Sequence, residues 1–398
     1  MSGRWRRSEL AYCTNVHPGE QLEAVERTLR TCVAGVRARR GLATAAGGVW
    51  LAEPAVRALL DPERRASWRA VLSDAGIELI TLNGFAYGNF HAESVKQRVY
   101  APDWSDPRRR DYTLALAELL ADCLPSHAWE GTVSTLPLGF RTPWTRARHA
   151  AALAALAETA RALGELAQRH GRAIRLCLEM EPGCVLERSA DAVDLFTREL
   201  PAAGAAIGVG RDLLDAHLGV CFDICHQAVM FEDLPAALAQ LHDANVQVGK
   251  IQVSSALEAP APAQARTALA RYDEPRYLHA VRSRGADGNL QSAMDLGAAL
   301  APGALPETST WRVHFHAPIH AEALADGTLA TTRAEIDKVL DYLAREPAMH
   351  PQLEVETYTW HVLPPAERPA DDEALLDGLA AEIQWLENAL AARGLLAS

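Results

Sequence analysis

The sequence predicts an α/β protein built as a single (β/α)8 TIM barrel. Short apolar runs alternate with longer stretches in which Leu and Ala recur at helical spacing. Such alternation is typical of parallel strands joined by crossover helices. About eight repeats of this unit in one chain favour a closed barrel over an open sheet. Since no linker-like stretch divides the chain, we expect one domain over residues 1–398.

The elements are predicted from the period of their apolar residues. The predicted strands cover residues 10–16, 43–50, 77–85, 131–139, 174–181, 217–224, 248–255, 311–317 and 352–358. The clearest helices cover residues 145–170, 189–200, 232–243, 331–345 and 371–394. Nine strands are one more than a simple barrel uses. Residues 256–310, rich in Ala, Pro and Gly, are therefore predicted to be an insertion over the barrel mouth, with helices near 262–272 and 290–300. One of the last three strands is then an accessory strand.

The net charge of -12 bears on the partners of the protein. Phosphate backbones repel an acidic protein unless a basic patch overrides this, and no basic run here is interleaved with a series of aromatic residues. We therefore expect no nucleic acid partner. Seven cysteines without CxxC pairs argue against a disulfide framework. With no apolar run near the ~18 residues of a membrane span and no signal-peptide pattern at the start, we expect a cytoplasmic protein.

Several predicted strands end in polar residues that a barrel interior would otherwise exclude. Alternate residues of a strand face the same way, so each strand presents these groups on one face. They are Glu179 and Glu181 in LCLEMEP, Asp223 with His226 in FDICH, Lys250, Gln252 and Ser254 in KIQVSS, and Glu354 and Glu356 in EVETYTW. Functional residues of TIM barrels come from the carboxyl ends of the strands, so we expect these groups to meet at one mouth.

Acidic strand ends that converge predict a bound cation. Burying several carboxylates together without one is costly. The alternative is that each carboxylate pairs with a local Arg or caps the next helix. Two Glu, one Asp and a Gln carbonyl are hard oxygen donors. We therefore expect one or more divalent metal ions, with Mn favoured, Mg as an alternative, and Zn or Co if a histidine joins the site.

The same residues resemble the metal site of the xylose-isomerase-like sugar isomerases and epimerases. LCLEMEP, FDICH, GKIQVSS and EVETYTW look like the ligand-bearing strands of that superfamily. The resemblance implies that Glu179, Asp223, Gln252 and Glu356 hold the metal and that His226 contacts the substrate. Gln252 matches hydroxypyruvate-isomerase-like members, where ketose epimerases carry His. The long interval between Gln252 and Glu356 departs from the pattern and leaves open which Glu completes the site.

A closer resemblance covers nearly the whole chain. YCTNVHPGE, VKQRVYAPDWSDPRRRDYT, VHFHAPIH and EVETYTW are similar to the EboE family of metabolite traffic proteins, which are described as sugar phosphate isomerase/epimerase-like barrels. This resemblance implies a role in processing or moving a secondary-metabolite precursor, with partners encoded in the same gene cluster. The substrate and the reaction do not follow from it.

Further polar residues are predicted to contact the substrate at the mouth. The whole set is His17, Asn83, Glu181, His226, Lys250, His314, His316 and Glu354. A histidine on a strand is more often a core or substrate-binding group than a ligand, so metal ligation by His316 stays an alternative. Cys225 is expected to be a buried thiol and not a ligand. Trp50 and Trp360 are candidates for apolar walls.

Three functions are compatible with this site. In the first, the metal chelates adjacent carbonyl and hydroxyl oxygens of a small sugar- or polyol-like substrate, and Glu179 and Glu356 act as acid and base in an isomerisation or epimerisation. In the second, a non-catalytic barrel uses the metal site to bind and carry a metabolite. The third is a DNA-repair nuclease of the same fold, which the acidic charge and the scarcity of histidine ligands disfavour.

Overall fold

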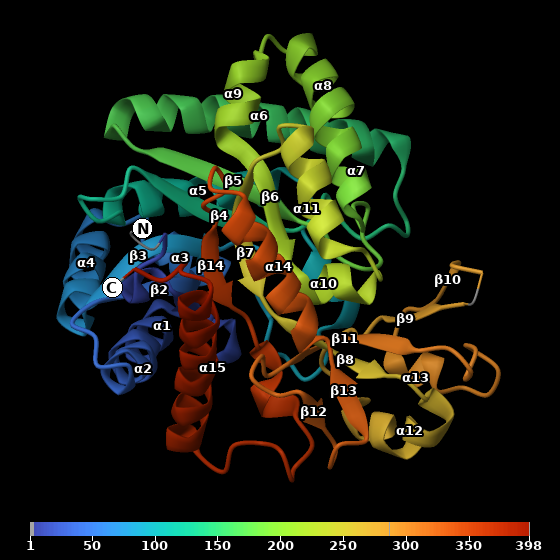
Figure 1. The fold of residues 1–398 in the computed structure, drawn as a ribbon. Coiled ribbons are helices and arrows are strands. Elements are labelled where there is room, and N and C mark those ends of the chain that lie inside the picture. Colours follow the sequence, from blue (N-terminus) through green and yellow to red (C-terminus); the bar gives the residue numbers. More distant parts are fainter. Residues whose placement is uncertain (1–3, 286, 398) are drawn as a thin grey trace.

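Eight parallel strands form the barrel in a computed structural model that describes residues 4–285 and 287–397. They are β1 Ala11–Tyr12, β2 Ala45–Trp50, β3 Ile77–Asn83, β4 Glu130–Thr135, β5 Ala173–Glu179, β6 Leu218–Asp223, β7 Val248–Val253 and β14 Gln352–Val355. Their order is β1-β14-β7-β6-β5-β4-β3-β2, and a parallel bridge between Cys13 and Gly48 joins β1 to β2 (Figure 1). The predicted fold class is confirmed.

Helices surround the barrel and connect its strands, apart from two that lie within residues 256–310 beside the added strands (Figure 1). They are α1 Leu22–Thr28, α2 Ala34–Arg39, α3 Glu53–Ala58, α4 Pro62–Ala75, α5 Pro107–Cys123, α6 Arg146–His170, α7 Ser189–Asp194, α8 Leu200–Ala206, α9 Arg211–His217, α10 Ile224–Val229, α11 Leu234–Asp243, α12 Pro262–Leu269, α13 Leu296–Ala299, α14 Arg333–Arg345 and α15 Asp372–Ala392. Short π-helical turns continue α1 into α2 and α7 into α8. Over the described part of the chain, no helix is long and apolar enough to cross a membrane.

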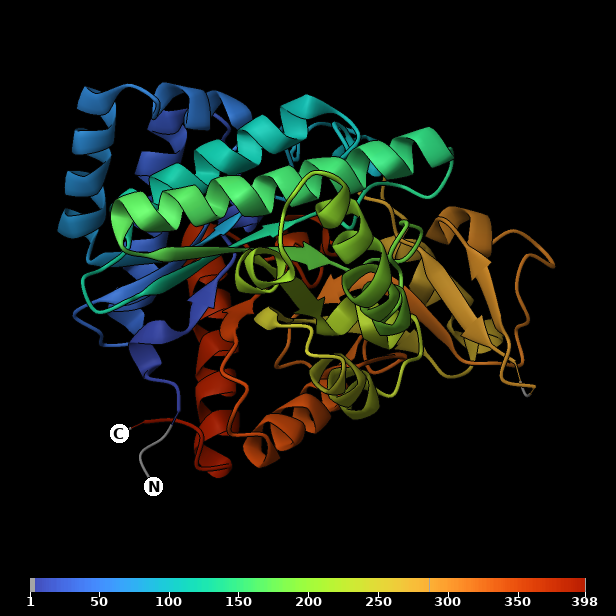
Figure 2. The same ribbon diagram turned by 90° about the horizontal axis from the view of Figure 1, so that it is seen from above.

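Helix α6 illustrates how local sequence determines an element. The Thr145 hydroxyl accepts a hydrogen bond from the backbone N–H of Arg148 at the start of the helix. Leu156 and Leu163 lie two turns apart on one face and are fully buried. Gly171 ends the helix with φ 67°, a conformation that a β-carbon disfavours. Figure 2 shows α5 and α6 lying side by side along the barrel.

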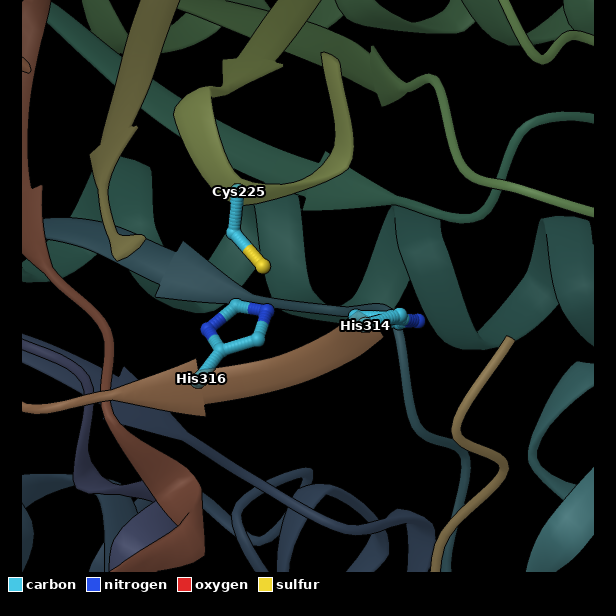
Figure 3. A group of neighbouring side chains, drawn as sticks. All are labelled: Cys225, His314 and His316. Carbon is cyan, nitrogen blue, oxygen red and sulfur yellow. The ribbon is translucent and has the colours of Figure 1, made fainter. Parts of the chain in front are cut away.

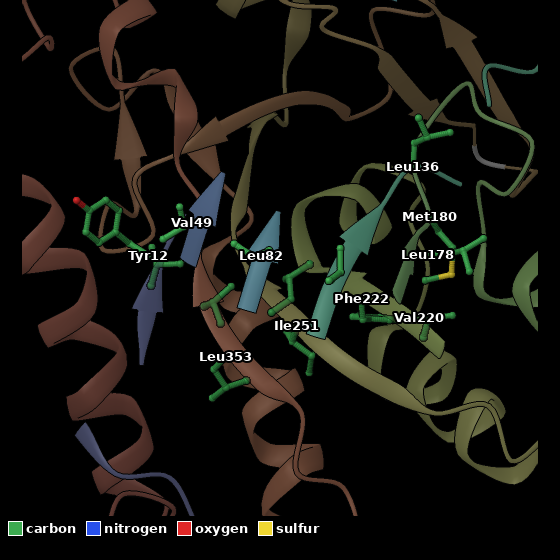
Figure 4. Packing of buried hydrophobic residues seen from close by; sticks show 14 of the residues in the cluster. Tyr12, Val49, Leu82, Leu136, Leu178, Met180, Val220, Phe222, Ile251 and Leu353 are labelled. Atoms are coloured by element: carbon green, nitrogen blue, oxygen red, sulfur yellow. The ribbon is translucent and has the colours of Figure 1, made fainter. Parts of the chain in front are cut away.

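The main apolar core lies between the strands and the helices. Leu178 of β5, Phe222 of β6 and Ile251 of β7 are fully buried in one cluster (Figure 4). Because alternate residues of a strand face opposite sides, the polar residue that follows each of them faces the barrel axis. The apolar pattern that builds the core therefore also directs polar groups to the interior of the barrel.

The predicted insertion is more ordered than the sequence indicates. Within the described residues, a six-stranded antiparallel sheet has the order β10-β9-β11-β8-β13-β12. Its strands are β8 Ser255–Ala259, β9 Val281–Arg284, β10 Leu290–Ala293, β11 Trp311–Ala317, β12 Ala323–Leu324 and β13 Leu329–Thr331. The accessory strand is 311–317, and the sheet extends past the predicted limit of residue 310.

The helix predicted near 290–300 is only partly present, because β10 occupies its start and α13 is four residues long. The helix near 262–272 corresponds to α12 and a short 3-10 turn. Strands such as VRSR and LQSA have no apolar run that would mark them in the sequence; they pair with each other, and β9 also pairs with the more distant β11. Figures 1 and 2 show the added sheet beyond one end of the barrel, and β8 begins two residues after β7 ends.

Candidate active site

Three carboxylates meet where barrel strands end. Glu179 is the last residue of β5, Asp223 is the last residue of β6, and Glu356 directly follows β14. One oxygen of each lies within 4.8 Å of the others. The three residues are 3%, 0% and 7% exposed. The structure thus brings together three of the four predicted metal ligands in a buried, acid-rich cluster.

Burial and mutual repulsion dominate the electrostatics of this cluster. Burial, reinforced by the charges of Glu356 and Asp223, raises the pKa of Glu179 well above its ordinary value. Burial and the charge of Asp223 raise the pKa of Glu356 to about 8. The nearby cation Lys250 is already paired with Glu354. A divalent cation bound among these oxygens would reverse both shifts, because it stabilises the ionised form of each carboxylate.

Asp223 is held with one oxygen satisfied and the other open. Its Oδ1 accepts hydrogen bonds from the Ser254 hydroxyl at 2.8 Å and the His226 backbone N–H at 2.9 Å. Its buried Oδ2 has no hydrogen-bond partner. Buried polar atoms are nearly always satisfied, so an orphan oxygen in an acidic cluster needs a ligand. A carboxylate oriented by donors on one side and open on the other fits a metal ligand.

Gln252, the fourth predicted ligand, has an open oxygen as well. It is fully buried on β7, next to Asp223 in the register of the sheet. Its Nε2 donates to Asn83 Oδ1 at 3.2 Å, and its Oε1 has no partner. The amide is therefore oriented so that a carbonyl oxygen, a hard donor suited to Mn or Mg, is free.

Neutral histidines and a thiol lie beside the carboxylates. His316 Nδ1 donates to the backbone carbonyl of Glu356 at 2.8 Å, which leaves Nε2 without a partner and 3.9 Å from Asp223 Oδ2. One ligand atom each of Cys225, His314 and His316 lies within 4.8 Å of the others. Figure 3 shows the Cys225 thiol directed toward the His316 ring. These nitrogen and sulfur donors would favour zinc over manganese if they took part in binding.

His226 and His314 form a hydrogen-bonded pair. His226 Nδ1 donates to the carbonyl of Met180 at 3.0 Å, and its Nε2 lies 3.0 Å from His314 Nε2. If His226 is neutral, its Nε2 accepts, so His314 Nε2 is the donor and His314 Nδ1 is an acceptor. Burial lowers the pKa of His226 to about 4 and that of His314 well below its ordinary value, so both rings are neutral near pH 7.

Glu181 lies beside this pair with a perturbed acidity. Its Oε1 accepts a hydrogen bond from the Tyr100 hydroxyl at 2.8 Å and lies 3.7 Å from His314 Nδ1. Burial raises the pKa of Glu181 to about 8, although the hydrogen bond from Tyr100 opposes the shift. A carboxyl group with a pKa near neutrality can donate or accept a proton at physiological pH.

A cavity with an empty volume of about 650 Å³ opens onto the cluster. Glu179 and Glu356 lie at its floor, and its walls include Trp50 at the end of β2, the loop after β3, and Tyr277 and Leu278 of the added segment. The lining residues are Asn15, Trp50, Asn83, Phe85, Ala86, Phe90, Val95, Lys96, Val99, Tyr100, Glu179, Glu181, His226, Tyr277, Leu278, His314, Glu356 and Tyr358.

Comparison with known proteins addresses the fold. No model of a known protein family matches this sequence, and no curated protein matches it. A putative xylose isomerase from Rhodospirillum rubrum is 14% identical and has a TM-score of 0.50, with 96% of this chain and 98% of that chain covered. The chain has the xylose-isomerase-like TIM-barrel fold.

Two further solved structures are similar over nearly the same length. A xylose isomerase domain protein from Planctomyces limnophilus is 16% identical, with a TM-score of 0.47 and coverage of 96% of this chain and 95% of that chain. An IolI protein with a bound zinc atom is 11% identical, with a TM-score of 0.49 and coverage of 96% and 98%.

Some predicted substrate-binding residues of this xylose-isomerase-like barrel have other partners. Lys250 Nζ lies 3.0 Å from Glu354 Oε1, and both residues are fully buried. Asn83 joins them, because its Oδ1 accepts from Lys250 and its Nδ2 donates to Glu354. His17 lies 3.0 Å from the Tyr12 hydroxyl. Among the described residues that line the cavity, Asn83 is present and Lys250, Glu354 and His17 are absent.

Much of the aromatic wall was not predicted from the sequence. Trp50 was a candidate wall and lines the cavity, whereas Phe85, Phe90 and Tyr358 were not singled out. Tyr358 had a usable signal, because it follows Glu356 at the alternate position of the same segment. Phe85 and Phe90 lie in the loop after β3, where periodicity gives no information about direction.

Proposed function

We propose that this xylose-isomerase-like barrel is a divalent-metal-dependent enzyme of the isomerase or epimerase type, acting on a small hydroxy-carbonyl metabolite. The observation that supports it most is the buried meeting of Glu179, Asp223 and Glu356, with Asp223 Oδ2 and Gln252 Oε1 left unpartnered beside them. Because buried carboxylates without a counter-charge are strongly destabilising, the cluster fits a cation.

The proposed ligands are Glu179, Asp223, Gln252 and Glu356, all of which offer oxygen. This donor set favours Mn, with Mg as the alternative. His316 is a further candidate, since its open Nε2 lies 3.9 Å from Asp223 Oδ2. Its participation would shift the preference toward Zn or Co.

The two glutamates are the proposed acid and base. A bound divalent cation supplies Lewis-acid polarisation of adjacent carbonyl and hydroxyl oxygens. Glu179 and Glu356 lie on strands that β6 and β7 separate, so their carboxylates approach the cavity floor from different sides. One of them takes the proton next to the carbonyl, and a proton is returned to the neighbouring carbon or to the opposite face. Asn15 Nδ2 donates to Glu356 Oε1 at 2.7 Å and orients that group.

The resemblance to the EboE family supports a finer proposal and a second candidate. The finer proposal is that the substrate is a secondary-metabolite precursor and that the partners are encoded in the same gene cluster. The second candidate is a non-catalytic carrier that uses the metal site to hold the metabolite. The traffic role of that family favours it, whereas the open ligand oxygens and the acid–base pair favour catalysis.

Metal analysis of the purified protein tests the central proposal. We expect about one tightly bound divalent ion per chain, an increase in thermal stability with added Mn, and loss of both in Asp223→Asn. Mass spectrometry of solvent deuterium incorporation then separates enzyme from carrier, since exchange that disappears in Glu179→Gln and Glu356→Gln supports catalysis. A folded protein with no bound metal and no stabilisation by Mn would refute the metal site.

A further inference from the structure

The cavity above the carboxylates is walled by aromatic rings. Phe90 lies with its ring centroid 5.8 Å from that of Trp50, 5.0 Å from that of Tyr277 and 5.5 Å from that of Tyr358. Tyr277 and Tyr358 are themselves in contact at 4.8 Å. All four residues line the cavity. They come from β2, the loop after β3, the added segment and the turn after β14, so four distant parts of the chain converge to build one apolar surface.

A second aromatic group contributes to the same lining. Phe85 and Tyr100 lie 6.0 Å apart and both line the cavity, together with the small side chains of Ala86, Val95 and Val99. Polar lining groups include the carboxylates and histidines near the barrel axis. A ligand that fills this space therefore contacts polar groups at one end and aromatic or aliphatic surfaces along its sides. A free sugar or polyol, with a hydroxyl on most carbons, would place several hydroxyls against these apolar walls without hydrogen-bond partners.

The cavity lining is poor in cationic side chains. Glu179, Glu181 and Glu356 line it, and among the described lining residues Lys96 is the only lysine or arginine. Lys96 Nζ is already bound to Asp295 Oδ2 at 2.6 Å. The Nε2 atoms of His226 and His314 lie 3.0 Å apart, so at least one of them is unprotonated. The lining therefore presents no free cationic side chain that could bind a phosphate group.

We propose that the substrate is an uncharged α-hydroxy ketone or aldehyde that carries an aryl group, and not a free sugar or a sugar phosphate. This inference rests on the proposed function for the reacting end of the molecule. The hydroxy-carbonyl end faces the carboxylates, and the aryl group lies against Phe90 and Tyr277. Offset or edge-to-face contacts with such rings stabilise a flat ligand beyond the burial of its area.

The reaction on the simplest such compound balances without a further reactant. In 2-hydroxyacetophenone, a C–H bond of the hydroxymethyl carbon breaks and a C–H bond forms at the former carbonyl carbon. A proton moves from the hydroxyl oxygen to the former carbonyl oxygen. The product is 2-hydroxy-2-phenylacetaldehyde, an isomer of the substrate.

Three probes that differ only at one end test the proposal. They are 2-hydroxyacetophenone, dihydroxyacetone and dihydroxyacetone phosphate, titrated calorimetrically into the full-length protein with and without Mn. We expect 2-hydroxyacetophenone to bind at least about tenfold more tightly than dihydroxyacetone, which corresponds to about 1.4 kcal/mol. Dihydroxyacetone phosphate is expected to bind no more tightly than dihydroxyacetone. Deuterium incorporation into each probe is followed in parallel by mass spectrometry.

Variants of the wall locate the aryl group. Phe90→Ala is expected to weaken binding of 2-hydroxyacetophenone at least about fivefold and to change binding of dihydroxyacetone less than twofold. Ala86→Leu keeps the apolar character but fills the same space, and it is expected to weaken aryl binding without removing a ring. Trp129→Ala is the matched control, because Trp129 is 71% exposed and lies outside the cavity lining.

The outcomes separate this inference from the proposed function. Tight aryl binding that depends on Phe90, without deuterium exchange, would support the ligand class and count against the isomerase. Exchange into dihydroxyacetone with no preference for the aryl probe would support the isomerase and overturn the ligand class. Preferred binding of dihydroxyacetone phosphate, or equal affinities for all three probes in wild type and Phe90→Ala, would also overturn it.

Discussion

Replacing Lys250 by Met tests how charge is balanced inside the barrel. Lys250 Nζ contacts Glu354 Oε1 at 3.0 Å and donates to Asn83 Oδ1 at 2.9 Å. Both charged residues are fully buried. Burial is the largest single effect and lowers the pKa of Lys250, but the charge of Glu354, the hydrogen bond that it accepts from Lys250 and the nearby thiols of Cys221 and Cys13 together outweigh it, so the net pKa is raised. Lys250 is therefore charged in the folded protein over the physiological pH range.

The expected cost follows from leaving Glu354 buried without its counter-charge. Removing one partner of a buried ion pair typically costs about 3–5 kcal/mol, whereas replacing both by apolar residues is often close to neutral. We therefore expect Lys250→Met to lose about 3–5 kcal/mol of unfolding free energy. The double variant Lys250→Met with Glu354→Met is expected to recover most of that loss, because no uncompensated charge remains.

Urea denaturation followed by circular dichroism measures this difference. Lys338→Met is the matched control, since the Lys338 side chain is 56% exposed and its partner Glu335 keeps a second ion pair with Arg312. We expect that control to change the unfolding free energy by less than about 1 kcal/mol. A Lys250→Met variant that is as stable as wild type would contradict the expected cost of leaving Glu354 without its counter-charge. If it is stable but has lost ligand affinity, Lys250 is the substrate contact that the sequence predicts.

Two further predictions concern a close contact inside the barrel and the dependence of the unfolding free energy on pH. A β-carbon at Gly48 would overlap the buried Glu354 carboxylate, so Gly48→Ala is expected to cost about 1–3 kcal/mol of unfolding free energy. Gly210→Ala, where a β-carbon has nothing within 4 Å, is expected to cost less, and equal denaturation midpoints for the two variants would contradict this. Burial raises the pKa of Glu382 from 4.5 to about 7. The folded state therefore keeps this proton longer than the unfolded chain, and stability falls as pH rises from about 4.5 to 7, by up to about 3 kcal/mol. Glu382→Gln is expected to lose less unfolding free energy than wild type between pH 5 and pH 7.5, although it also disturbs the hydrogen bond from Trp360. An unchanged dependence of stability on pH in this variant would contradict the prediction for Glu382.

Local pattern was enough to predict the barrel. Most barrel strands contain a short apolar run, and a helix such as α6 has its own period, cap and end, with Thr145 at its start and Gly171 after its last turn. These signals depend on residues a few positions apart, so they survive in the sequence alone. The added sheet lacks them, because β9 and β10 are four-residue strands that are stabilised mainly by pairing with each other and with β11.

The sequence by itself determined which polar residues face the barrel axis, because a strand alternates its faces with a fixed period of two. It could not determine their neighbours. Glu354 and Glu356 share a face, yet the first is paired with Lys250 in the barrel interior and the second meets Glu179 and Asp223 at the cavity floor. That difference depends on the register between strands and on how far each side chain lies along the axis. The aromatic wall of the cavity likewise depends on tertiary structure, because only the closed barrel and the added segment bring its rings together.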